Sequence, residues 1–396
     1  MALTKYKEPQ TYTPAFNEQV FLYISNQIAI PDFKYVVEVT INSIVYTYNV
    51  FQRPDGFMVF DAMDVVKNHI RTYFNRDTNN YIATTDKIAV QFKVTEYYGG
   101  TLNASSTVNY TVFNACLKTK DFKNYVSTEW YKPILANYTD FKVFMNETYD
   151  ATNLDQNVTL NTDYWVTFIR GIADTIPWTI YDELSTVLSS GSITLPAGTD
   201  KDIIRINLSP SYFATLSGVT MLNGYSIEAS LNDTSGTLAD IFIPTINEVC
   251  TKYEVFRLYF LKRNGAIGYK TFEKSSEQKI SKKQNEVRID PSTVFVSGGG
   301  YDYGRRADQH YSNVVSTINE YSITLNTDWI TQDQSILLDE LFDSPLVWLQ
   351  NDVDGSIQAV SIKDNSYTYK KHENETLFNY SVTVDIDVNE SRQKGI

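Results

Sequence analysis

The chain has 396 residues, of which 34 are lysine or arginine and 47 are aspartate or glutamate, so its net charge at pH 7 is −13. This length exceeds what one ordinary compact core accommodates, so two or three domains are expected. The acidic balance argues against a nucleic-acid reader, whose affinity comes largely from lysine and arginine at phosphates.

The composition favours β structure. There are 29 tyrosines and 21 phenylalanines, and aromatic and β-branched residues fit the half-buried faces of strands. Cys116 and Cys250 lie far apart and predict two buried thiols rather than a disulfide framework, and no spacing suits a metal site. We therefore expect a mainly β protein with β-sandwich-type domains and a few short helices, and no metal or other cofactor.

The first nine residues are polar and lack the apolar core of a signal peptide. No stretch approaches the length of a membrane span. The expectation is a protein made in the cytoplasm, with no membrane insertion by this chain.

Residues 1–135 are expected to form an N-terminal β-sandwich-like domain with one helix. The alternation of apolar and polar residues predicts strands at 33–41, 44–50, 57–60 and 88–94. Tight turns are expected at Asn42-Ser43, Arg53-Pro-Asp-Gly56 and Gly99-Gly100. Asp61 is expected to cap a helix whose apolar residues are Met63, Val66, Ile70 and Phe74.

Residues 136–250 are rich in Asn, Thr, Ser and Asp and predict a second β-domain, or an insertion that faces a neighbour. Short strands are expected at 164–169, 193–195, 203–208 and 225–229. Ser189-Ser190-Gly191 and Asn232-Asp233 are typical of the turns between them.

Residues 251–396 are expected to form a C-terminal β-rich assembly domain. It starts with a hairpin, strand 253–260, turn Lys262–Gly265 and strand 269–272. A long arm or loop is then expected at 273–317. Its basic run, Glu273–Arg288, either meets an acidic neighbouring subunit or is a solvated charged strand, which is slightly favoured.

The same arm or loop contains a glycine-rich segment, 298–312. Its candidate contact residues are Gly299, Tyr301, Arg305 and Arg306. This segment is either a loop that orders on assembly or touches DNA, or a mobile loop without a ligand. It is not a phosphate-binding loop, because no Lys-Ser/Thr pair follows the glycines.

The last part predicts a β-α-β-β unit followed by one more strand. Strand 321–325 precedes a helix that starts at Thr331, with Gln334 as its capping partner, and Pro345 ends that helix. Strands are then expected at 346–349 and 357–362, joined by an Asp354-Gly355 turn, and a single long strand at 378–388.

Three groups of motifs resemble tail proteins of tailed phages infecting Bacteroidota, crAss-like phages included. The first is Tyr321-Ser-Ile-Thr-Leu-Asn-Thr-Asp-Trp329 with Ser344–Leu349 and Leu377–Tyr380. The second is Pro14–Asn17, Phe33–Val36, Arg53–Gly56 and Val59–Asp61, and the third is the Arg257–Leu261 and Gly268–Phe272 hairpin. Ala266-Ile267 departs from the family pattern at the hairpin turn.

This resemblance implies a structural component of the virion tail, a ring or hub protein of distal-tail type. The implied partners are copies of the chain in a sixfold or twelvefold ring, other tail proteins, and double-stranded DNA that passes through the channel without sequence-specific binding. The C-terminal unit is then expected to form the assembly interface, with the candidate residues Trp329, Leu341, Phe342, Trp348, Phe378 and Tyr380.

No catalytic signature is present, so we expect no enzyme. His69, His310 and His372 are scattered and predict structural roles, and the carboxylates of Asp385 and Asp387 predict a solvated edge rather than a cation site. The alternative function is a tail-tip adhesin that binds a receptor or glycan. Its stacking residues would be Trp165, Trp178 and Trp348.

Overall fold

The computed structural model describes residues 3–123, 125, 158–169, 175–199, 202–232, 238–242, 245–246, 252–288, 292–305, 312–327, 329–331, 338–351, 355–363 and 377–386. Over these ranges the chain is mainly β with a few short helices, which confirms the predicted fold class. No helix within them is long and apolar enough to cross a membrane.

The chain divides into two compact units. The first contains residues 1–250, 259–270 and 336–345, and the second contains 251–258, 271–335 and 346–396. The units are therefore interleaved in sequence. The predicted division into three consecutive ranges stays a prediction.

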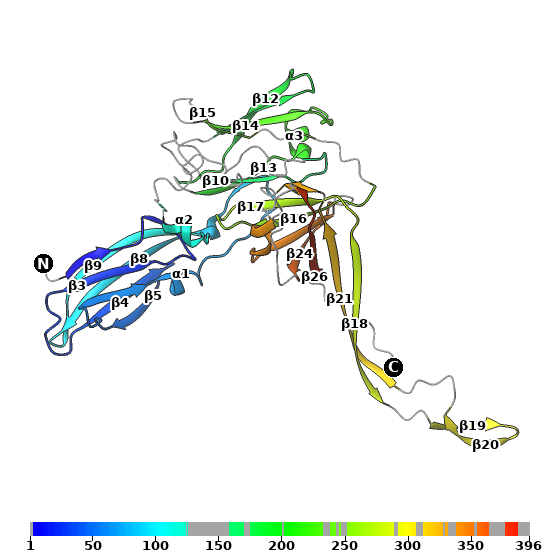
Figure 1. Ribbon diagram of the computed structural model, residues 1–396, viewed down its shortest axis with the longest axis horizontal. Helices are drawn as coiled ribbons and strands as arrows, with labels where there is room; N and C mark the ends of the chain where they lie inside the picture. The colour runs from blue at the N-terminus through cyan, green and yellow to red at the C-terminus, as the bar shows by residue number, and fades with distance from the viewer. Residues whose placement is uncertain are drawn as a thin grey trace. The chain divides into compact units, whose positions relative to one another are not determined.

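The N-terminal part of the first unit is a sandwich of two sheets (Figure 1). The five-stranded sheet has the order β2 (Tyr12–Pro14), β9 (Thr101–Phe113), β8 (Lys87–Tyr98), β4 (Lys34–Ile41) and β5 (Ile44–Val50). The three-stranded sheet has the order β1 (Leu3–Lys7), β3 (Val20–Ser25) and β6 (Phe57–Asp61). Both sheets contribute to one buried core, in which the rings of Phe21 on β3 and Phe92 on β8 stack.

The predicted turns of this part are confirmed by backbone conformation. Asn42 and Ser43 have φ values of 48° and 66°, and Gly56, Gly99 and Gly100 also have positive φ. Two consecutive residues with positive φ form the hairpin turn whose twist matches that of the paired strands.

The predicted helix is shorter than expected. α1 spans only Met63–Val66, and Asp61 lies in β6, although its carboxylate accepts the N–H of Met63 at 3.0 Å as a cap would. Ile70 is buried without being helical, because Arg71 donates its N–H to the carbonyl of Thr85 instead of to a preceding turn. The short segments β7 (Asn80–Ile82) and η1 (Thr84–Asp86) follow.

The rest of the first unit contains two further sheets. One has the order β10 (Trp165–Ile169), β13 (Ile203–Asn207) and β7. The other has the order β12 (Val187–Thr194), β11 (Thr175–Tyr181), β14 (Ser226–Asn232) and β15 (Leu238–Phe242). The helices α2 (Thr119–Lys123) and α3 (Pro210–Ser217) also belong to this unit.

The four strands predicted in this region are present, but the turn predicted at 189–191 is wrong. These residues lie inside β12, and a Cβ on Gly191 would come within 2.7 Å of the Trp178 ring. The glycine is therefore required by the close approach of an aromatic ring, and not by a turn. Asp233 of the second predicted turn lies outside the described residues.

A seven-stranded sheet contains most of the C-terminal strands. Its order is β17 (Ile267–Phe272), β16 (Phe256–Leu261), β23 (Val347–Asn351), β24 (Ile357–Ile362), β26 (Ser381–Ile386), β21 (Ser312–Asn326) and β18 (Glu277–Arg288). The β16–β17 hairpin is confirmed, and Gly265 in its turn has a φ of 89°. The remaining pairs are β19 (Ser292–Ser297) with β20 (Gly300–Arg305), and β22 (Ile330–Thr331) with β25 (Leu377–Phe378).

One prediction about the last part is corrected. The long strand expected at 378–388 is interrupted, because the backbone of Tyr380 exchanges two hydrogen bonds with Thr327 between β25 and β26. Residues 338–342 are helical and Thr331 lies in β22, but residues 332–337 lie outside the described part, so the start of this helix at Thr331 stays a prediction. Gln334 and residues 387–388 lie outside the described residues.

Candidate functional site

The segment predicted as an arm or loop is a two-stranded ribbon. β18 pairs with β21 from the Glu277–Thr324 pair to the Arg288–Ser312 pair. On its other side, among the described residues, β21 pairs with β26 from Tyr321 to Asn326. Figure 1 shows β18 and β21 continuing side by side past the end of β26. We call residues 282–319, which lie beyond this point, the arm.

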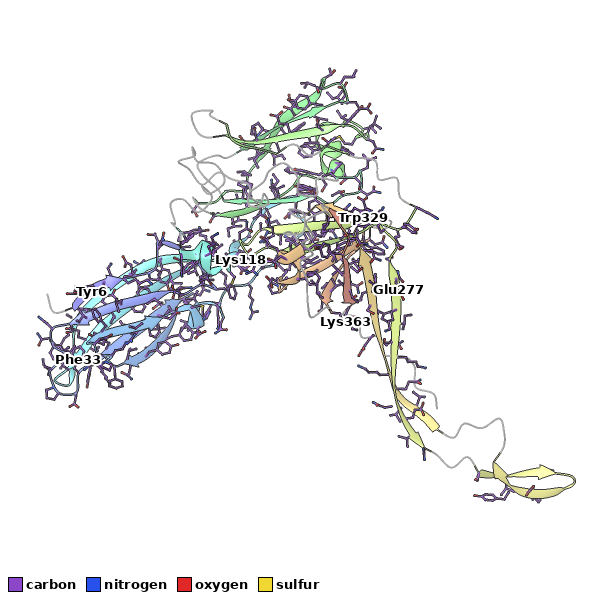
Figure 2. The ribbon with its side chains drawn as sticks, in the orientation of Figure 1. Tyr6, Phe33, Lys118, Glu277, Trp329 and Lys363 are labelled. Carbon is purple, nitrogen blue, oxygen red and sulfur yellow. The ribbon has the colours of Figure 1, made fainter. Side chains whose placement is uncertain are left out.

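The described side chains of the arm are mostly exposed, although Asn319 at its base is 6% exposed. All residues of β18 are exposed except Ser281, which is intermediate, and Val287 and Val315 show 55% and 44% of their surfaces. Figure 2 shows the side chains that it draws on the arm, beyond Glu277 at the start of β18, projecting outward from the ribbon. An isolated two-stranded ribbon is at best marginally stable in water, so this geometry calls for a partner surface.

The far end of the arm is the hairpin β19–β20. Gly298 and Gly299 form its two-residue turn, with φ values of 61° and 88°. The predicted glycine-rich loop is therefore a strand–turn–strand unit up to Arg305, whose pairing partner is Ser292. The side chain of Arg305 and the whole of Arg306 lie outside what the structure describes.

One face of this hairpin is an exposed apolar patch. Val294 is opposite Tyr303, and Val296 is opposite Tyr301, and residues opposite each other share a face of the sheet. Their exposed fractions are 65%, 68%, 73% and 86%, in that order. We call these four residues the tip patch. Of the predicted contact residues, Gly299 is in the turn beside it and Tyr301 is part of it.

β18 and the three residues before it are basic in an acidic chain. Residues 274–288 contain five basic and two acidic residues, a net charge of +3. Lys283 forms an ion pair with Glu320 at 2.5 Å and lowers the pKa of that carboxyl. Lys282 and Arg288 are exposed and have no ion-pair partner within the described ranges.

The structure does not bring the six predicted assembly residues together on one exposed surface. Leu341 is fully buried and Tyr380 is 9% exposed, so both belong to the interior of the chain. Phe342 and Trp348 are half-buried, and the side chain of Phe378 is outside the described part. Trp329 is the exposed member, with 63% of its surface accessible to solvent (Figure 2).

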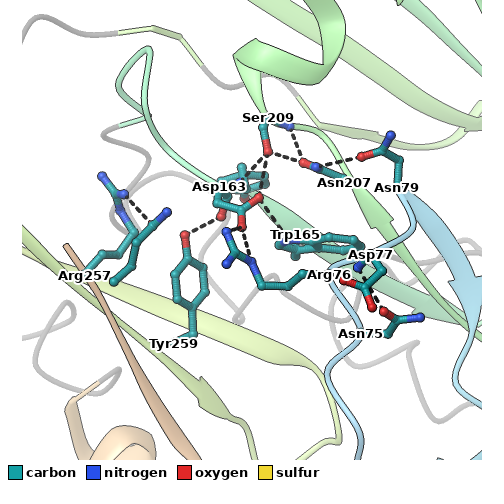
Figure 3. A network of polar contacts seen from close by, with 12 residues as sticks. Asn75, Arg76, Asp77, Asn79, Asp163, Trp165, Asn207, Ser209, Arg257 and Tyr259 are labelled. Carbon is teal, nitrogen blue, oxygen red and sulfur yellow. Dashed lines mark hydrogen bonds and ion pairs between the residues drawn. The ribbon is translucent and has the colours of Figure 1, made fainter. Parts of the chain in front are cut away.

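A polar network within the first unit was not predicted from sequence. Its centre is Asp163, whose carboxylate pairs with Arg76 at 2.5 Å and accepts from Trp165 at 3.1 Å and from Ser209 at 3.3 Å (Figure 3). The backbone carbonyl of Asp163 accepts the hydroxyl of Tyr259. These contacts join β10, the start of α3, β16 and the chain before β7, which is a structural role.

A buried ion pair lies in the same unit. Arg205 donates to the carboxylate of Asp86, and both side chains have no exposed surface. Burial raises the pKa of Asp86 above its usual value, although the Arg205 guanidinium acts to lower that pKa. Burial alone would lower the pKa of Arg205, but Asp86 beside it raises that pKa, so the guanidinium stays charged. Thr72 also donates to Asp86, at 3.1 Å.

The other predicted residues have ordinary surroundings. Trp165 and Trp178, candidates for stacking on sugars, are 1% and 5% exposed. His69 contacts the Tyr46 hydroxyl at 2.8 Å, and Asp385 forms an ion pair with Lys363.

The expectation of a buried thiol at Cys116 is wrong. Its thiol is free and exposed, because Cys116 follows β9 beyond the sandwich core. Cys250, His310, His372 and Asp387 lie outside the described ranges. Within those ranges, no group of three or more His, Cys, Asp and Glu side chains is arranged to hold a metal ion.

The comparisons with known proteins add no assignment. Neither a scan against protein-family models nor a search of curated proteins finds a match to this chain.

Proposed function

We propose that this chain is a structural component of a tailed bacteriophage virion, a tail ring or hub protein. It assembles with copies of itself around the DNA channel and catalyses no reaction. The observation that carries the proposal is the arm. It extends from a sheet as two paired strands, of which β18 is almost entirely exposed, and it exposes valines and tyrosines at its end. Such an element is suited to binding a neighbour.

The arm is compatible with a ring. An arm that binds a different surface of the next copy without receiving that copy's arm in return makes a heterologous contact, and repetition of that contact closes a ring when the rotation allows it. The resemblance of three groups of motifs to tail proteins supports the place of this ring in a phage tail, with sixfold or twelvefold symmetry. The net charge of −13 suits a channel in which DNA slides without adhering.

The alternative adhesin function has less support. Two of its three candidate tryptophans, Trp165 and Trp178, are buried, and a buried ring offers no face to a sugar. A glycan array with the purified protein separates the two functions, because a ring component is expected to bind no glycan.

The direct test is the mass and shape of the purified protein. We expect native mass spectrometry and negative-stain images to show closed rings, and the chain to be present in purified virions. A matched variant replaces residues 283–318 by Asn-Gly, which closes a hairpin between the paired residues Lys282 and Asn319. This variant is expected to fold as a monomer. A stable monomeric full chain, or absence from virions, would contradict the proposal.

A further inference from the structure

The arm presents two features to a partner, the apolar tip patch and unpaired cations on β18. A surface that fits it must therefore offer exposed apolar side chains next to carboxylates. Elsewhere in the chain, the hairpin formed by β11 and β12 has this combination. We call β11, β12 and the turn between them, residues 175–194, the receiving hairpin.

The apolar part of the receiving hairpin is exposed. Leu184 in the turn is 85% exposed, and Val187 and Leu188 on β12 are 55% and 39% exposed. β12 is the outer strand of its sheet, so its far edge has no neighbouring strand within that sheet. Exposed apolar side chains on an outer strand are typical of a surface that another chain covers.

Among the residues that the structure describes, the carboxylates on and beside the receiving hairpin have no cationic partner. Asp182 accepts the backbone N–H groups of Leu184 at 2.9 Å and Thr186 at 2.7 Å. Glu228, on the neighbouring strand β14, accepts the hydroxyl of Tyr181 at 2.9 Å. Glu183 is exposed beside Leu184. The donors to Asp182 and Glu228 are neutral, so their charge is available to Lys282 and Arg288 of an arm.

The distribution of charge along the chain points to a second copy as the partner. The receiving hairpin, residues 175–194, contains two acidic residues and no basic residue, a net charge of −2. Residues 274–288, with a net charge of +3, are therefore complementary to it. Charge complementarity of this kind guides association and selects the partner surface.

Duplex DNA fits the arm less well. A phosphate-binding surface is made mainly of lysine and arginine, whereas the tip patch is valine and tyrosine, and Lys283 is already paired with Glu320. Valine side chains gain nothing from a charged, hydrated backbone. They do gain from covering Leu184 and Val187.

We propose that the tip patch and the cations of β18 in one copy dock on the receiving hairpin, β11–β12, of a second copy. This inference rests on the proposed function, because it names the surface that holds adjacent copies of the ring together.

Site-directed cross-linking between copies tests the contact. In a Cys116→Ser and Cys250→Ser background, a Tyr301→Cys chain is mixed with a size-tagged Leu184→Cys chain under mild oxidation. The control partner is Val45→Cys, since Val45 lies on the outer strand β5 and is 53% exposed. Because a disulfide requires Cα atoms within about 7 Å, we expect at least about tenfold more mixed dimer with Leu184→Cys than with the control.

Charge reversal gives a second readout. The double variant Lys282→Glu and Arg288→Glu is expected to associate about tenfold more weakly, because two attractive pairs become repulsive. Glu183→Lys in the same chain is expected to restore part of the association. Failure of the restoration, with the double variant folded by circular dichroism, would overturn the pairing of these surfaces.

The outcomes separate this inference from the proposed function. Rings without the 301–184 cross-link overturn the docking contact and leave the ring function standing. A monomer without the cross-link overturns both. Binding of a labelled DNA duplex that is lost in the Lys282→Glu and Arg288→Glu variant would assign the arm to nucleic acid instead.

Discussion

At the scale of single residues, the Asp86–Arg205 pair is the most sensitive point that the structure shows. Both side chains are fully buried, so neither charge has water to compensate for a lost partner. Arg205→Met is expected to lower the free energy of unfolding by about 3–5 kcal/mol, because it leaves the Asp86 carboxylate without its cation. Urea denaturation measures the loss.

The double variant Arg205→Met and Asp86→Leu supplies the control for this pair. Replacing both charges by apolar groups removes the uncompensated carboxylate, so it is expected to recover much of the stability that the single variant loses. A single variant as stable as the unmodified chain would show that the carboxylate reaches solvent.

The Lys87–Asp202 pair makes stability depend on pH. Burial alone would raise the pKa of Asp202, but the Lys87 ammonium at 2.8 Å and donors from Thr199 hold it below its usual value. A lowered folded pKa contributes stability above the unfolded pKa of about 4, and that stability is lost as the pH falls through the folded value. Asp202→Asn is therefore expected to cost about 1 kcal/mol at pH 7 and progressively less as the pH falls below about 4 toward pH 2.

Urea midpoints at several pH values between these limits check this expectation. Glu8→Gln is the matched control, since Glu8 pairs with Lys5 at the surface and both are well exposed. Its effect is expected to be small at every pH. An Asp202→Asn penalty that is unchanged in acid would assign the effect to packing rather than to charge.

At the scale of elements, the helix at residues 338–342 has a sharp test. Leu341 has no exposed surface, so Leu341→Asp places a carboxylate in an apolar interior and is expected to cost at least about 3 kcal/mol. Leu102→Asp on β9, where the leucine is 62% exposed, is the matched control and is expected to change little. Equal melting temperatures for the two variants would mean that this helix is placed wrongly.

The turn at the tip of the arm gives a second test at this scale. Gly299 has a φ of 88°, so Gly299→Val is strained and is expected to loosen the pairing of β19 with β20. Gly298 has a φ of 61°, which asparagine adopts readily, so Gly298→Asn is expected to be tolerated. Hydrogen exchange at residues 294–303 compares the two, and equal protection would contradict the turn geometry.

The elements also show where sequence reasoning succeeds. Alternating apolar residues and positive-φ turn residues identified β4, β5 and the β16–β17 hairpin, because both signals are local. The turn predicted at Ser189–Gly191 is wrong, because Gly191 is required by the close approach of the Trp178 ring on another strand and not by a turn. Pro210 and Gly218 at the ends of α3 are a local signal that would have located this helix.

The candidate site was partly visible in the sequence. The basic run at 274–288 and the glycines at 298–300 indicated an arm or loop, but its ribbon form depends on pairing between residues as far apart as Arg288 and Ser312. The receiving hairpin was not predicted, because exposure of Leu184 and Val187 follows from the fold. The same holds for Leu341 and Tyr380, since apolar sequence does not distinguish a core from an interface.

At the scale of the whole molecule, the chain carries opposite charges on the two surfaces that the proposed docking contact joins. Residues 175–194 have a net charge of −2 and residues 274–288 one of +3. Attraction between exposed charges is screened over about 8 Å at physiological salt, and over shorter distances as salt increases. The stability of the assembly is therefore expected to depend on ionic strength.

We expect the oligomer fraction, measured by analytical ultracentrifugation at fixed protein concentration, to fall as salt rises from about 0.05 M to about 0.5 M. Tyr301→Ser removes apolar area from the tip patch, so it is expected to weaken association by a similar factor at every salt concentration. The Lys282→Glu and Arg288→Glu variant is expected to flatten or reverse the salt dependence, because it removes the attraction that salt screens. If the oligomer fraction of the unmodified chain does not change with salt, the arm is held by apolar contacts alone.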